Sequence, residues 1–192
     1  MTGKGHLASN TCSLVAISSV TILLTSEKSS LYNEQLSNTI KLALDNYILK
    51  SSLPMVLFAT ISILLFYLGT LLPDIDFQAS LLGRFLYLPI EHRSWTHAIY
   101  LPIIFGVASI WFRPLLFLSL GYVLHLLWDN LSKAGICFLY PLNSKKTRYG
   151  IEKKRHILRF YKSGKASEYV LLGVILSLTI VLIIFTIITM YN

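Results

Sequence analysis

The sequence predicts an all-α integral membrane protein that forms a single domain over residues 1–192. Of the residues, 54% are hydrophobic and only 14% are charged, and the mean hydropathy is +0.62. Because a soluble domain carries about 25% charged residues, this composition excludes an ordinary soluble protein. The apolar residues also gather in runs long enough to cross a bilayer, so we expect about five transmembrane helices plus an interfacial amphipathic helix.

The apolar runs set the boundaries of the predicted transmembrane helices. The run over residues 53–72 has the length of about 20 residues that a helix needs to cross roughly 30 Å of hydrocarbon, and Pro73 ends it. The first run is the least hydrophobic, and its serines and threonines suit helix–helix packing. The predicted spans are residues 7–25, 53–72, 96–112, 114–131 and 168–191.

Residues 33–49 are predicted to form the amphipathic helix. Apolar residues recur at helical spacing from Leu36 to Ile48. Lys41 and Asp45 lie on the opposite face, so we expect this helix to lie in the membrane interface or to cover the bundle.

The 17 lysines and arginines are distributed unevenly between the two faces that five spans define. Thirteen lie in the N-terminus, the 73–95 connection or the 132–167 connection, and four lie on the other face. Positive residues concentrate on the cytoplasmic side, so we expect a multi-pass protein of the inner (cytoplasmic) membrane with the N-terminus inside and the C-terminus outside. The net charge of +8 therefore indicates topology, and nucleic acid is not expected as a partner.

The segment GYVLHLLWD, residues 121–129, contains the first candidate site residues. His125 and Asp129 are four residues apart, which places them on one face of a helix about one turn apart. A carboxylate in such an apolar run costs roughly 2.5–3.5 kcal/mol and needs a partner. That partner is a metal ion, a proton or a cationic side chain; the simpler alternative is a His–Asp hydrogen bond that joins helices.

Seven histidines and acids are predicted to meet at the cytoplasmic edge. Asp74, Asp76 and Asp129 lie at predicted helix C-termini, where the helix dipole disfavours an acid by up to about 1 kcal/mol. A cation bound between them would explain this placement. His6 and His97 lie near helix N-termini, where the dipole keeps imidazole neutral, as a metal ligand must be. The candidate metal ligands are His6, Asp74, Asp76, His92, His97, His125 and Asp129.

Taken singly, these segments have simpler explanations: PDID as a helix stop, and HRSWTH as an interfacial loop in which Thr96 caps a helix. Their convergence on one face favours a shared centre. The donors suit zinc, with manganese or iron as alternatives, and are too rich in nitrogen for calcium. Seven candidates exceed the ligands of one catalytic zinc, so the sequence allows one or two ions, with Asp76 or Asp129 as a bridge.

The same residues carry a family resemblance. The blocks are GTLLPDID at 69–76, HRSWTH at 92–97 and GYVLHLLWDNLSKAGICFLYP at 121–141, with weaker matches at GKGHLAS (3–9) and KSGKASEYV (162–170). In this order they resemble the YdjM-like family of membrane-bound, metal-dependent hydrolases. That family is distantly similar to zinc-dependent phospholipase C and P1-type nucleases, and the similarity implies phosphoester hydrolysis by analogy.

The expected function is therefore metal-dependent cleavage of a phosphoester in a lipid or lipid-linked substrate at the cytoplasmic face. A carboxylate among Asp74, Asp76 and Asp129 that does not bind metal would act as general base. Arg93 is predicted to act in catalysis and, with Arg84 and Thr96, to bind the substrate.

Two other functions use the same sequence features. A metal-ion carrier would use the ligands for transport, although carriers place such groups near the bilayer midplane. A non-enzymatic scaffold would use the basic 133–165 loop to bind anionic lipid, nucleic acid or a partner protein, although the loop has too few aromatic residues for a surface on which bases stack. The oligomeric state is not predicted.

Overall fold

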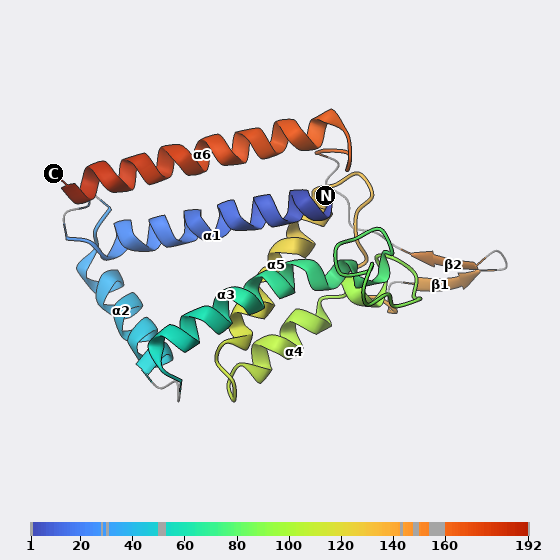
Figure 1. The fold of residues 1–192 in the computed structure, drawn as a ribbon, viewed down its shortest axis with the longest axis horizontal. Coiled ribbons are helices and arrows are strands. Elements are labelled where there is room, and N and C mark those ends of the chain that lie inside the picture. Colours follow the sequence, from blue (N-terminus) through green and yellow to red (C-terminus); the bar gives the residue numbers. More distant parts are fainter. Residues whose placement is uncertain are drawn as a thin grey trace.

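The computed structural model describes residues 2–27, 29, 31–49, 53–142, 144–147, 150–153 and 160–191. Its architecture confirms the predicted helical class, with one short β-hairpin in addition (Figure 1). The α-helices of the described residues are α1 (Gly3–Thr25), α2 (Glu34–Leu49), α3 (Met55–Leu71), α4 (Tyr100–Ala108), α5 (Leu115–Asn130) and α6 (Ala166–Tyr191). Two 3-10 helices, η1 (Leu72–Asp76) and η2 (Trp95–His97), lie in the connection between α3 and α4.

Three helical segments in the described residues are long and apolar enough to cross a membrane. They are α1 with 23 residues, α3 continued by η1 with 22 residues, and α6 with 26 residues. The helices in the predicted third and fourth spans are shorter, with nine residues in α4 and 16 in α5. Helix α4 starts later than predicted because Trp95–His97 forms η2 and the extended residue Ala98 separates η2 from α4.

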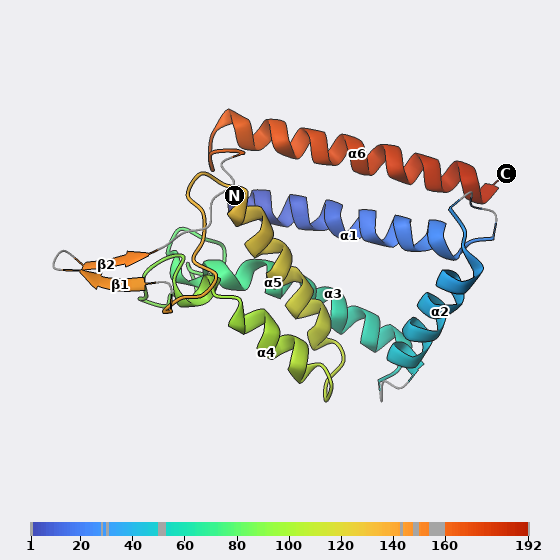
Figure 2. The same cartoon turned by 180° about the vertical axis from the view of Figure 1, so that it is seen from behind.

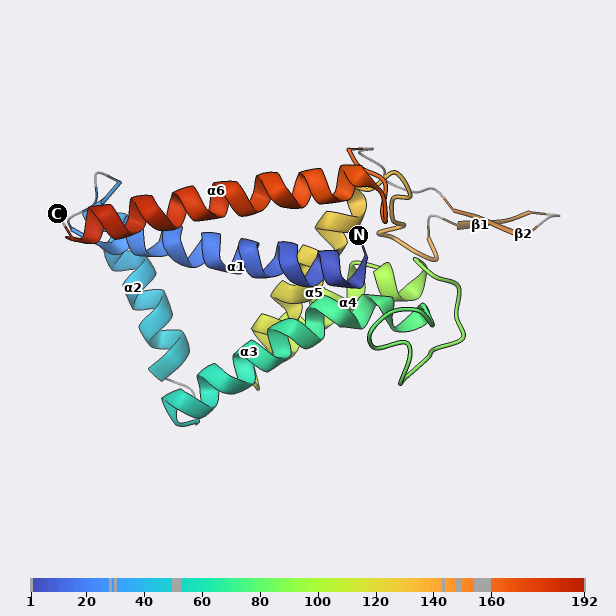
Figure 3. The same cartoon turned by 45° about the horizontal axis from the view of Figure 1, so that its top comes forward.

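The helices bring one set of their ends together. The N-terminal ends of α1, α4 and α6 and the C-terminal ends of α3 and α5 lie at the same end of the molecule (Figures 1 and 2). Helices α1 and α6 lie side by side and run in the same direction, while α3 and α5 run the other way (Figure 3). Residues that are distant in sequence therefore meet at this end, which we call the site end.

Helices α3 and α5 cross in direct backbone contact near the site end. A Cβ atom added to Gly69 would lie 2.1 Å from the carbonyl oxygen of Leu118, and one added to Gly121 would lie 2.1 Å from that of Phe66. Small residues at helix crossings let backbones approach closely in membranes. These two glycines therefore set how near α5 comes to the end of α3.

Polar side chains attach α1 to its neighbours. Asn10 donates through Nδ2 to Thr70 Oγ1 at 3.0 Å and to the carbonyl oxygen of Gly121 at 3.2 Å, which joins α1 to α3 and α5. At the start of α1, the backbone N–H and the hydroxyl of Thr2 both donate to Glu168 Oε1 on α6, each at 2.9 Å. The N-terminal part of α1 is thus joined to α3 and α5 by Asn10 and to α6 by Thr2.

The amphipathic helix expected over 33–49 is present as α2. It lies at the end of the molecule opposite the site end (Figure 1). There Arg113, in the turn between α4 and α5, lies 5.4 Å from the ring centroid of Tyr47 and donates to the carbonyl oxygen of Asn46 at 2.6 Å. The turn between α4 and α5 therefore reaches the far end.

The basic segment over residues 133–165 contains a β-hairpin that was not predicted from the sequence. Strands β1 (Ser144–Thr147) and β2 (Gly150–Lys153) pair antiparallel and project away from the helices (Figures 1 and 2). Residues 143, 148, 149 and 154–159 of the predicted 133–165 loop lie outside the described residues.

Gly121→Ala is expected to destabilise the fold. The added methyl group would collide with the backbone of α3, and such overpacking costs about 1–3 kcal/mol. The midpoint of thermal unfolding in detergent should fall, as followed by circular dichroism. Gly173→Ala on α6 is the matched control, because its added methyl would meet no atom within 4 Å. Equal midpoints for the two variants would contradict the close crossing.

Candidate metal centre

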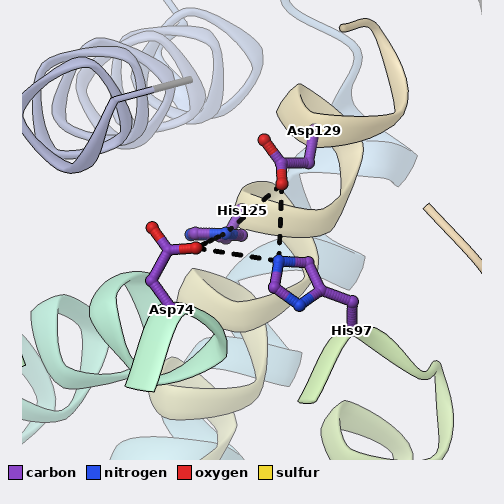
Figure 4. Close-up of side chains that lie close together, drawn as sticks. All are labelled: Asp74, His97, His125 and Asp129. Carbon is purple, nitrogen blue, oxygen red and sulfur yellow. Dashed lines mark ion pairs between the residues drawn. The ribbon is translucent and has the colours of Figure 1, made fainter. Parts of the chain in front are cut away.

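Four buried side chains converge at the site end. They are Asp74 from η1, His97 from η2, and His125 and Asp129 from α5 (Figure 4). Each offers one ligand atom, and these atoms all lie within 4.8 Å of one another. We call these residues the four-residue cluster.

The spacing within the cluster suits a shared ion. His97 Nε2 lies 3.4 Å from Asp129 Oδ2 and 3.7 Å from Asp74 Oδ1. His125 Nε2 lies 3.6 Å from Asp74 Oδ1 and 3.9 Å from Asp129 Oδ2. Ligands about 2.0–2.2 Å from a tetrahedral zinc stand roughly 3.3–3.6 Å apart, so small movements would bring these atoms onto one ion.

The hydrogen bond of His125 fixes its tautomer. His125 Nδ1 lies 2.7 Å from the carbonyl oxygen of Thr70 in the last turn of α3. A carbonyl oxygen only accepts hydrogen bonds, so Nδ1 must carry the proton. The Nε2 atom of a neutral His125 then presents its lone pair to the cluster, where it makes no hydrogen bond within the described part of the chain.

His97 is oriented by a similar chain of hydrogen bonds. The Thr96 hydroxyl donates its proton to Asp76, so its oxygen is left to accept from His97 Nδ1 at 3.0 Å. His97 Nε2 therefore also faces the cluster as a lone pair, again without a hydrogen bond among the described residues. Burial lowers the pKa of His97, which favours the neutral form that a metal needs.

His6 from α1 lies directly against the four-residue cluster. Its Nε2 lies 3.1 Å from Asp129 Oδ1, and its ring stacks on that of His125 with centroids 3.7 Å apart. An Nε2–H of His6 can donate to Asp129 and orient that carboxylate. His6, which was predicted as a metal ligand, therefore lies in the centre and contacts Asp129, but it is not one of the four residues of the cluster.

Arg93 also contacts Asp129. Its Nη2 lies 3.0 Å from Asp129 Oδ2, and its Nη1 donates to the carbonyl oxygen of Gly135 at 3.0 Å. Arg93 has φ of 62°, a left-handed conformation that is uncommon for residues other than glycine and that often marks functional sites. Arg93, which was predicted to contact the substrate phosphate, is therefore buried and pairs with the carboxylate of Asp129.

Asp76, His92 and His97 form a second group of donors. Asp76 Oδ1 lies 2.7 Å from His92 Nδ1, while Asp76 Oδ2 accepts from the Thr96 hydroxyl and from the Arg93 backbone N–H at 3.2 Å. Both oxygens of Asp76 thus already have protein donors. In the four-residue cluster, Nε2 of His97 and Nε2 of His125 make no hydrogen bond to the residues that the structure describes. The four-residue cluster is therefore the better candidate for a first ion.

An open hollow reaches the second group. Its volume is about 610 Å³, and its lining includes Asp76, Phe77, Tyr87 and His92. The side chain of His92 is 36% exposed and its ring stacks on Phe77, whereas Asp76 is buried. This hollow gives solutes access to the edge of the centre.

All seven predicted ligands therefore lie in or beside one centre, and two of the three predicted substrate contacts, Arg93 and Thr96, contact those ligands. Arg84 lies elsewhere, in a separate hollow with Lys4. The sequence reading missed the carbonyl oxygen of Thr70 and the hydroxyl of Tyr122, which donates to the Thr96 carbonyl oxygen. A contact made to a backbone oxygen leaves no mark on the identity of the residue that supplies it.

A family model described as YdjM inner membrane protein matches residues 1–191. No curated protein and no solved structure matches the chain.

Asp74→Asn is expected to weaken metal binding. The variant keeps the side-chain shape but replaces an anionic donor, and losing even an outer partner of a ligand costs about 10–100-fold in affinity. The zinc dissociation constant, measured by chelator competition on the purified protein, should rise at least by that factor. Asp45→Asn on α2, at the opposite end, should bind zinc as the wild type does. Equal affinities for the two variants would exclude Asp74 as a ligand.

Proposed function

The chain belongs to the YdjM inner membrane protein family, and we propose that it is a membrane hydrolase that uses a divalent metal ion to cleave a phosphoester in a lipid or lipid-linked substrate. The observation that carries the proposal is a pair of buried Nε2 atoms, on His97 and His125, that face two buried carboxylates and make no hydrogen bond to any described residue. Buried polar atoms are normally satisfied, so such a pair is well explained by a ligand that the protein binds.

The donor set fits a divalent metal ion. Two imidazole nitrogens and two carboxylates suit zinc, with manganese or iron as alternatives. Because Asp76, His92 and His97 form a second group of donors, the centre would hold one or two ions. When bound, such an ion lowers the pKa of water toward about 7 and polarises a phosphoryl oxygen.

The protein's own residues would orient the donors and move protons. His6 from α1 and Arg93 from the connection between η1 and η2 each contact one oxygen of Asp129, which keeps that carboxylate directed into the centre. The pair formed by Asp76 and His92 borders the open hollow, so it can accept a proton from an incoming nucleophile. Thr96 orients both Asp76 and His97.

The position of the centre supports a lipid substrate. The cluster lies where α1 and α6 begin and where α3 and α5 end, which is the boundary of the membrane-spanning helices (Figure 1). The alternating directions of α1, α3, α4, α5 and α6 fit five crossings, of which α4 and α5 form a short pair. With five crossings, thirteen of the 17 lysines and arginines share the face of the site, which favours the cytoplasmic side.

The same position weighs against a metal-ion carrier. Carriers place their ligands near the bilayer midplane, often on broken helices. Here His6 lies in the first turn of α1, and Asp129 is the penultimate residue of α5.

Metal removal is expected to abolish lipid hydrolysis. Purified protein in detergent micelles should release water-soluble phosphate compounds from phospholipids, lose this activity with a chelator and regain it with zinc. His125→Gln removes one ligand, so it should lower kcat at least about 1,000-fold, because one tenfold step in rate needs only 1.36 kcal/mol of lost transition-state stabilisation.

Asp45→Asn is the control and should retain full activity. The proposal fails if the metal-loaded protein cleaves none of the phospholipids and lipid-linked phosphates supplied. Metal uptake by proteoliposomes containing the protein, without hydrolysis, would assign the centre to transport.

A further inference from the structure

A second hollow lies beside the first turn of α1. Its volume is about 370 Å³, in the range of small-molecule sites, and it is formed by α1, residues 79–84 and the start of α6. It adjoins the metal centre without being part of it: Lys4 in its lining is two residues from His6, and Ser80 donates to the carbonyl oxygen of Asp74 at 2.7 Å.

The hollow carries positive charge. Lys4 and Arg84 line it, both are exposed, and no carboxylate is among its described lining residues. The N-terminal end of α1 adds the positive pole of a 23-residue helix. The nearby acid Glu168 is buried and accepts hydrogen bonds from Thr2 and from the Gly164 N–H, so its oxygens already have donors.

The other wall of the hollow is apolar. Leu81, Tyr169 and Leu172 line it, and the latter two belong to the first turns of the membrane-spanning helix α6. Tyr169 is 67% exposed, and tyrosines are typical of the interface between lipid and water. The hollow therefore combines two cationic side chains with an apolar wall that belongs in part to the membrane-spanning helix α6.

We propose that this hollow binds the phosphate head group of an anionic phospholipid. Lys4 and Arg84 would contact the phosphate oxygens, and an acyl chain would follow Leu172 along α6. A zwitterionic lipid adds a cationic group to the same phosphate, so it gains less from two neighbouring cations. The inference goes beyond the proposed hydrolysis, because binding here requires neither metal nor turnover.

The test measures lipid binding on the full-length protein in detergent with a chelator present. Native mass spectrometry should record phosphatidylglycerol binding in preference to phosphatidylcholine. Lys4→Gln combined with Arg84→Gln should raise the dissociation constant for phosphatidylglycerol at least tenfold. Lys4→Arg combined with Arg84→Lys keeps both charges and should preserve the preference.

Lys162→Gln combined with Lys165→Gln is the matched control, because it removes the same charge at the same end but outside this hollow. It should bind phosphatidylglycerol as the wild type does. An equal loss of binding in this control, or no loss in the Lys4 and Arg84 variant, would overturn the site. Displacement of the lipid by an equal concentration of glycerol phosphate would overturn its assignment to a lipid.

Discussion

The hydrogen bond between His125 and the carbonyl oxygen of Thr70 connects the chemistry of the centre to the packing of the helices. Thr70 lies in the last turn of α3, where a helix leaves carbonyl oxygens without an intrahelical partner. Gly69 and Gly121 let the backbones of α3 and α5 approach closely at the same crossing, which places His125 within reach of this oxygen. The hydrogen bond fixes the proton of His125 on Nδ1 and leaves Nε2 to face the carboxylates. A substitution that separates α3 from α5 would therefore also displace the Nε2 atom of His125.

Buried carboxylates are costly, and side chains from several elements stabilise them. Arg93, from the connection after η1, places its positive charge beside Asp129, and His6 on α1 lies within hydrogen-bond distance of the same carboxylate. The first turn of α1 is held in turn by the hydrogen bonds between Thr2 and Glu168 on α6. The helices that cross the membrane thus act together to place polar groups at one end. The rest of each of these helices is apolar and suits contact with the hydrocarbon of the bilayer.

Part of this centre could be predicted from sequence and part could not. Residue type and helical spacing were enough to find His125 and Asp129, and the ends of apolar runs were enough to find Asp74 and Asp76. The connection from 73 to 95 has no helical period, so nothing in it indicated that Arg84 would turn toward α1.

Other features depend on tertiary contacts that a linear pattern does not contain. The late start of α4 and the pairing of β1 with β2 are of this kind. The partner of Arg93 is another, because its guanidinium was expected to meet substrate and lies against Asp129. Arg93 was identified as a site residue, but its partner is set by how the connection after η1 packs against α5.

The most direct test of the centre is anomalous diffraction from crystals of the zinc-loaded protein, recorded on both sides of the zinc absorption edge. The account predicts one strong peak about 2.0–2.2 Å from Nε2 of His97, Nε2 of His125 and a carboxylate oxygen of Asp74 and of Asp129. A strong zinc peak elsewhere with none among these four residues, or metal-replete crystals without a peak there, would contradict it.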